Sequence, residues 1–254
     1  MQNKKYEADF YADNLIMSFS QKQINKYFSI KKTLDSGKKI ELPSIEPHSS
    51  LSPFNKAPIR ENIEEIICHA TKLFEFKSKS TSFFTDSKLT NTEKEQYREK
   101  YYEVINNINE LKSQLFPILL EYKKSYDKHI KTILSIDAQY AEFLSYKAAL
   151  YNEKEYEKQI KQIESVLKES KERFLSEAAL TYHIYASVTI IYDDSINGFF
   201  KNSLSASGAP SFDAFNSNAF FEVTEAFCAR VRLQLSSIMN PPSTEELLDK
   251  YFEI

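Results

Sequence analysis

Apolar residues recur at alternating spacings of four and three along the middle of this chain, which is the repeat of a coiled coil. The first register runs through Tyr97, Tyr101, Val104, Ile108, Leu111, Leu115, Ile118 and Tyr122. The second runs through Tyr156, Ile160, Ile163, Leu167 and Phe174, and polar Ser170 interrupts it. From Asn91 to Asn197 the chain has no glycine and a single proline, Pro117. This pattern predicts very long helices whose apolar seams face one another.

The limits of these helices can be read from where the register stops. It lapses at Tyr151-Asn152-Glu153, so we expect a turn there between the two longest helices. A helix from Thr92 to Tyr151 would extend for about 90 Å, which predicts an elongated protein. The next helix is expected from about Glu153 to Leu204, followed by a loop from Ser205 to Pro210. A last helical pattern covers Ala219 to Ile238 and ends at Pro241-Pro242.

The N-terminal part of the chain has a different composition. Phe10 to Ile30 carries apolar residues at near-helical spacing among Gln, Lys and Asn, and is therefore amphipathic. Four prolines then mark an irregular connector: Pro43, Pro47, Pro53 and Pro58. A helix is expected from about Arg60 to Phe76, and a break from Thr81 to Thr92. We therefore expect an N-terminal segment and connector over residues 1–57, a helical domain over 58–240 and a short acidic tail over 241–254.

Composition restricts the class of protein. Only three glycines occur, too few for a sheet protein with many tight turns. The formal net charge is −3, which argues against bulk binding of nucleic acid. Cys68 and Cys228 are too few for a disulfide framework and are typical of a reducing compartment. No signal peptide or membrane-spanning stretch is evident, so we expect an all-α, cytoplasmic protein.

Candidate catalytic and metal-binding residues are sparse. The histidines are scattered, and those in apolar helical patterns, His69 and His183, are expected to be core residues rather than metal ligands. Asp193 and Asp194 are adjacent, and neighbouring positions on a helix point about 100° apart, so they would not converge on one metal ion. No glycine-rich phosphate loop or nucleophile elbow occurs. We expect no enzyme activity, no metal and no cofactor.

Lysines cluster about the expected turn. Those after the turn are spaced four, three and seven, so they share one helix face: Lys154, Lys158, Lys161 and Lys168. Those before it are Lys124, Lys128, Lys131 and Lys147, and two more, Lys31 and Lys32, follow the amphipathic segment. Such a basic stripe can bind anionic lipid at about 1 kcal/mol for each lysine. Glutamates interleave with these lysines, so the solvated flank of a coiled coil is the alternative.

Two segments resemble a known family. Leu115-Phe116-Pro117-Ile118 places a proline between apolar residues early in a long helix, and Glu142-Phe143 follows with Lys147 shortly after. The run from Tyr192 to Leu204 has an aromatic residue, acidic residues, a serine and then paired apolar residues. Both segments resemble the BAR domains of the amphiphysin and yeast Rvs type, in their second and third helices respectively. The resemblance covers roughly Tyr97 to Leu204.

The chain also departs from the family's pattern. Leu134-Ser135 stands where the family has a basic pair, so part of the concave positive charge is missing. Asp194 replaces a proline, and Leu144 replaces the second acidic residue of the motif. The proline-rich connector interrupts the region where a long first helix belongs.

The resemblance implies an elongated, antiparallel three-helix coiled coil that forms a crescent-shaped homodimer. It further implies a peripheral protein that senses or scaffolds membrane curvature through anionic lipid, as in endocytosis and membrane trafficking. The dimer contact is expected to involve the first helix, the start of the helix after Pro117, and Tyr192 to Leu204. The N-terminal amphipathic segment can either insert into the membrane or pack on the bundle. The alternative function is a coiled-coil scaffold that binds proteins and not lipid; a secreted effector or pore former is disfavoured because no membrane-inserting apolar segment is evident.

Overall fold

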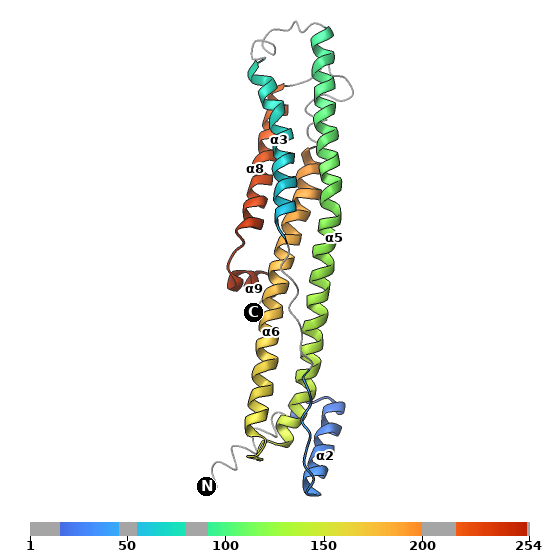
Figure 1. Ribbon diagram of the computed structural model, residues 1–254, viewed down its shortest axis with the longest axis vertical. Coiled ribbons are helices and arrows are strands. Elements are labelled where there is room, and N and C mark those ends of the chain that lie inside the picture. The colour runs from blue at the N-terminus through green and yellow to red at the C-terminus, as the bar shows by residue number, and fades with distance from the viewer. Residues whose placement is uncertain (1–15, 46–54, 80–90, 200–216, 253–254) are drawn as a thin grey trace. The chain divides into compact units, whose positions relative to one another are not determined.

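The computed structural model describes residues 16–45, 55–79, 91–199 and 217–252 (Figure 1). All regular secondary structure in these ranges is helical, which confirms the expected all-α class. The helices are α2 (Gln21–Asp35), α3 (Ala57–Lys79), α5 (Asn91–Ala149), α6 (Glu157–Thr189), the π-helix η1 (Ile190–Ile196), α8 (Ser217–Met239) and α9 (Thr244–Phe252).

Most of the expected helices are present with shifted ends. α3, α5 and α8 begin and end within a few residues of the expected limits, and the turn after Ala149 confirms the lapse of the register. The third helix is different: it starts at Glu157 and changes to a π-helix at Ile190. α2 begins only at Gln21, after Ser20, and the acidic tail contains α9, which the sequence pattern did not indicate. The expected break from Thr81 and the loop from Ser205 to Pro210 lie outside the described residues.

Contacts divide the chain into two compact units, and α5 and α6 contribute to both. We call residues 1–51 with 127–178 the hairpin unit, and residues 52–126 with 179–254 the bundle unit. The sequence-based limits at residues 57 and 240 follow composition rather than contacts, and they stay a prediction.

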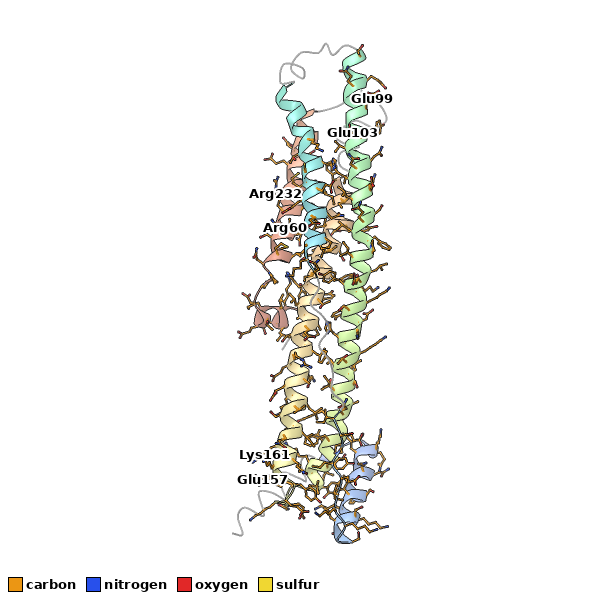
Figure 2. The ribbon with its side chains drawn as sticks, viewed as in Figure 1. Arg60, Glu99, Glu103, Glu157, Lys161 and Arg232 are labelled. Carbon is orange, nitrogen blue, oxygen red and sulfur yellow. The ribbon has the colours of Figure 1, made fainter. Side chains whose placement is uncertain are left out.

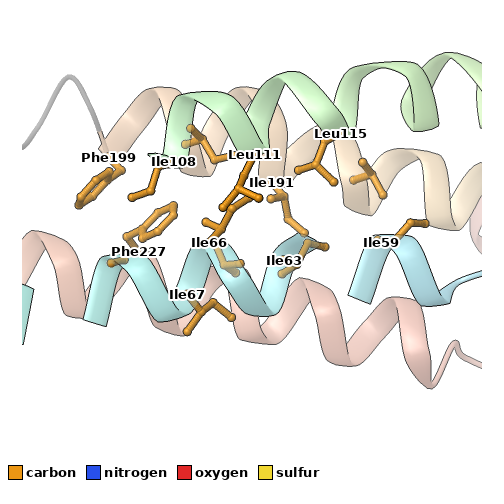
Figure 3. Packing of buried hydrophobic residues seen from close by; sticks show 14 of the residues in the cluster. Ile59, Ile63, Ile66, Ile67, Ile108, Leu111, Leu115, Ile191, Phe199 and Phe227 are labelled. Atoms are coloured by element: carbon orange, nitrogen blue, oxygen red, sulfur yellow. The ribbon is translucent and has the colours of Figure 1, made fainter. Parts of the chain in front are cut away.

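The bundle unit has one apolar core to which four helical segments contribute (Figure 3). Ile59, Ile63, Ile66 and Ile67 of α3 are buried, at the spacing of one helix face. The α5 register supplies Val104, Ile108, Leu111 and Leu115, all buried as the heptad pattern predicts. α6 and η1 add Ile184, Val188, Ile191 and Ile196. α8 completes the core, where the Phe227 ring stacks on that of Phe199 with centroids 4.6 Å apart.

The second register forms the core of the hairpin unit. Tyr156, Ile160, Leu167 and Phe174 of that register are buried, and Ile163 is half-buried. On α5, Ile133, Ile136, Phe143 and Tyr146 of the same unit are also buried. Two backbone hydrogen bonds shape the turn between the helices, from Glu153 N–H to Leu150 O and from Tyr156 N–H to Glu153 O.

α2 packs on α5 within the hairpin unit. Its start is a capping box, in which Ser20 accepts from the Gln23 backbone and Gln23 accepts from that of Ser20. The Gln23 side chain also donates to the Ala141 carbonyl (2.8 Å), and the Ser145 hydroxyl donates to the Gln23 carbonyl (3.2 Å). Ile30 is 5% exposed. α2 is therefore a packed structural helix, whereas residues 10–15 of the amphipathic segment lie outside the described residues.

The C-terminus of α2 is fixed by Gly37. Its φ of 71° is a left-handed conformation that side chains with a Cβ disfavour. Gly37 N–H donates to Leu34 O, and Lys38 N–H donates to Thr33 O, the two bonds of a Schellman motif. The chain then turns back so that Ile40 N–H donates to the Tyr156 hydroxyl (3.0 Å). This ending holds the segment after α2 against the start of α6.

Candidate membrane-binding surface

Nine of the ten candidate lipid-binding lysines belong to the hairpin unit. They are Lys31 and Lys32 of α2, Lys128, Lys131 and Lys147 of α5, Lys154 of the turn, and Lys158, Lys161 and Lys168 of α6. Lys124 belongs to the bundle unit. The hairpin unit is therefore the part of the chain in which the predicted lipid contacts gather.

Three of these lysines are engaged by carboxylates. Lys147 Nζ donates to both oxygens of Glu164, at 2.8 and 2.9 Å, and Lys168 lies 3.4 Å from the same carboxylate. Burial of Glu164 opposes ionisation, but the hydrogen bond and charge of Lys147, with the charge of Lys168, lower the pKa of this carboxyl. Lys147 is 16% exposed, so its charge is directed at Glu164 rather than at solvent.

The third engaged lysine forms a surface pair. Lys161 Nζ lies 2.7 Å from Glu157 one helical turn away, and Figure 2 shows the two side chains together on α6. Both side chains are well exposed, at 72% and 62%, so solvent screens the pair and it contributes little to stability. An anionic surface could compete with Glu157 for this ammonium group.

The remaining six candidate lysines of the hairpin unit are open to solvent or nearly so. Lys32, Lys128, Lys131, Lys154 and Lys158 are exposed, and Lys31 is half-buried. For this set the structure records no ion pair with another described residue. These six side chains are the part of the candidate set that remains available to an external anion.

The outer face of α2 adds an apolar contact to this charge. Phe28, one of the apolar residues of the amphipathic pattern, is 62% exposed. At about 100° per residue, Phe28 and Lys32 lie on the side of α2 opposite Ile30 and Gln23, which pack inward. Met17, just before α2, is 86% exposed. Residues 16–45 contain six lysines against Asp35 and Glu41, so this apolar face has a basic surround.

The histidines have structural roles in the described residues. His183 is buried between Ser237 and Tyr251, with its ring nitrogens 3.0 Å from both hydroxyls. His129 is 3% exposed and lies 3.6 Å from a Glu177 oxygen. Burial lowers the pKa of His129 and of His183. Asp193 and Asp194 are exposed, and the described residues contain no cluster of three or more side chains able to hold a metal ion.

Nothing in the described helices reaches the length and apolarity required to span a bilayer. In comparisons with models of protein families, with curated proteins and with solved structures, no significant match to the chain was found.

Proposed function

We propose that this protein binds anionic membranes peripherally through its hairpin unit, as a BAR-like sensor or scaffold of membrane curvature. The observation that carries the proposal is the outer face of α2, where exposed Phe28 stands among lysines on a helix whose other face is packed. An aromatic residue with flanking lysines is the side-chain set of an interfacial helix. Each lysine near an anionic surface contributes about 1 kcal/mol, so the open lysines together suffice for reversible binding.

The BAR-like part of the proposal concerns assembly as a two-fold, crescent-shaped homodimer. Its support is local to the bundle unit: Phe116 and Leu120, on either side of Pro117, are 46% and 37% exposed. The Phe116 ring lies 6.0 Å from that of Tyr192, so the two segments expected in the dimer contact are neighbours. A second copy covering this surface would remove exposed aromatic area from water. α8 is an addition that a three-helix BAR subunit does not require.

The alternative is a coiled-coil scaffold that binds proteins and not lipid. It is favoured by the ion pairs along α5 and α6, which include Lys171 with Asp137 at 2.6 Å in addition to those of Glu164. It is also favoured by exposed apolar residues on the two long helices: Leu134 of α5 and Val166 of α6 are 62% and 47% exposed. A helical partner could cover such residues.

Charge reversal separates the two functions. In the first variant Lys154 and Lys158 are both replaced by Glu, and in the matched control Lys72 and Arg230 of the bundle unit are both replaced by Glu. The net charge changes equally in both. Co-sedimentation with phosphatidylserine vesicles should fall sharply for the first variant and much less for the control, with unchanged helicity by circular dichroism. An equal loss in both variants would mean non-specific attraction, and equal binding by the first variant and wild type would favour the protein scaffold.

A further inference from the structure

A groove of about 900 Å³ lies between α2 and α5 in the hairpin unit. α2 lines one wall from Ser20 to Ser29, Ser44 adds to it, and α5 lines the other wall from Ser135 to Ser145. Apart from Ala138 and Ala141, every lining side chain carries a hydroxyl, an amide or a charge. Pockets for drug-like or lipid-tail ligands are mostly apolar and aromatic, so this lining is suited to a polar ligand.

The groove has a positive electrostatic character at the α2 end. Lys22 and Lys26 both line it and are one helical turn apart, whereas Glu142 is the one acidic side chain among the lining residues. The first turn of α2 contains no acidic residue, although the N-terminus of a helix carries partial positive charge that normally attracts one. Lys22 instead adds a second positive charge there. A bound anion would neutralise both the partial positive charge of the helix N-terminus and the charge of Lys22.

Some of the lining side chains hold the fold and others do not. Ser20, Gln23 and Ser145 make the bonds that cap α2 and dock it on α5. Lys26 Nζ lies 3.7 Å from Glu142 and 5.0 Å from the centre of the Tyr146 ring, a loose arrangement that a stronger anion can displace. For the side chains of Lys22, Ser29 and Ser135 the structure records no hydrogen bond or ion pair with another described residue. These three can be used by a ligand without disturbing the docking of α2.

From this arrangement we propose that the groove binds a phosphorylated polyol, for which an inositol phosphate is the model compound. Lys22 and Lys26 hold the phosphate, while Ser29, Ser135 and Glu142 exchange hydrogen bonds with the ring hydroxyls. A nucleotide is a poorer fit because none of the described residues lining the groove is aromatic, so its base has no ring to stack on. The site does not depend on membrane binding by the outer face of α2, because the groove and that face use different residues. The same headgroup chemistry occurs in free inositol phosphates and in phosphoinositide lipids, so either can be the source of the ligand.

Calorimetric titration of the full chain with a soluble inositol trisphosphate tests the site directly. Wild type should bind it in preference to unphosphorylated inositol and to inorganic phosphate, because the groove uses both the phosphate and the hydroxyls. Lys22→Ala should weaken binding about tenfold, the loss expected for one charge-assisted hydrogen bond. Lys38→Ala, at an exposed lysine of the same unit that is not among the residues lining the groove, is the matched control and should bind as wild type does.

A second variant blocks the groove without altering charge. Ser135→Leu should abolish inositol trisphosphate binding while the circular dichroism spectrum stays unchanged. Absence of binding by wild type, or equal binding by wild type and Lys22→Ala, would overturn the proposal. Equal weakening by Lys22→Ala and Lys38→Ala would also overturn it, because that result means diffuse attraction to surface lysines.

Vesicles distinguish the two sources of the ligand. If the ligand is a lipid headgroup, Lys22→Ala and Ser135→Leu should reduce binding to phosphoinositide vesicles and not to phosphatidylserine vesicles of equal charge. If the ligand is free, both variants lose soluble binding and the two vesicle types behave alike. Failure of the membrane proposal is a separate result: no anionic vesicle binds, while the soluble inositol trisphosphate still does.

Discussion

At the scale of single residues, two buried histidines make the fold sensitive to acid. Burial lowers the pKa of His129 and of His183 from the usual 6.5, outweighing the attraction of Glu177 for a protonated His129. The nearby ammonium groups of Lys128, and of Lys250 with Lys56, act in the same direction as burial. The folded state therefore holds both imidazoles in the neutral form.

This predicts a fall in stability at mildly acidic pH. Below about pH 6.5 the unfolded chain binds protons on these two histidines, whereas the folded chain does not. The full stability is therefore present above that pH, and it declines as the pH falls toward the lowered pKa values of the folded state. The pKa of the Glu164 carboxyl is lowered from 4.5, so its contribution is lost only at more acidic pH. The melting temperature should decrease between about pH 7.5 and pH 5.5, and less so in His129→Leu. A constant or rising melting temperature over this interval would show that neither histidine is held neutral.

The ion pair inside the hairpin unit gives a second prediction. Glu164→Gln would leave the half-buried Lys147 ammonium without its carboxylate, at a cost of about 1–2 kcal/mol in the free energy of unfolding. Glu157→Gln removes the exposed partner of Lys161 and serves as the control, with an effect within error. Urea denaturation measures both. Equal effects of the two substitutions would mean that the burial of Lys147 is not maintained in solution.

At the scale of helices, the heptad repeat predicted the long helices, whereas helix starts that only local capping residues mark were not predicted. The long registers identified α5, α6 and their turn because two core faces need apolar residues at fixed spacing. The start of α2 is marked by the capping box of Ser20 and Gln23, which is a local signal. The amphipathic pattern extends beyond this start and does not locate it. The sequence pattern does not indicate α9, because Pro241-Pro242 predicts the end of helical structure. Ser243 and Glu246 nevertheless form a second capping box directly after the two prolines.

The candidate membrane-binding surface was also only partly predictable from the sequence. The lysine stripes and the glutamates interleaved with them were visible in the sequence, but the pair of Lys147 with Glu164 was not, because it joins two helices. The exposure of Phe28 was also not predictable, since it depends on which face of α2 packs on α5. The groove beside α2 is a product of that docking and has no sequence signature.

The end of α2 gives a prediction about backbone conformation. Gly37→Ala should destabilise the protein by about 1 kcal/mol, because a Cβ strains the left-handed conformation at φ 71° even though nothing lies within 4 Å of it. Gly198→Ala is the matched control: its Cβ also meets nothing, its conformation is helical, and alanine is the better helix former. Thermal melts of both should therefore shift in opposite directions. A stabilising Gly37→Ala would mean that α2 does not end in this Schellman motif.

At the scale of the whole molecule, the proposal joins two properties that are tested separately, self-association and membrane binding. For the first, we predict a stable homodimer that Phe116→Asp with Leu120→Asp converts to a monomer, because charge would be buried in an apolar contact. Leu233→Asp, at a residue of α8 that is 67% exposed, should leave the dimer intact. Light scattering coupled to size exclusion measures the mass. A monomeric wild type at micromolar concentration would contradict the BAR-like assembly.

Membrane binding is the central claim, and the most direct measurement is co-sedimentation of the unmodified protein with vesicles over a series of salt concentrations. The protein should bind phosphatidylserine vesicles at low salt and not neutral phosphatidylcholine vesicles. Binding should weaken toward physiological salt, where the screening length is about 8 Å, without disappearing, because the Phe28 contact is not screened. No binding to anionic vesicles at low salt, or equal binding to neutral vesicles, would contradict the account.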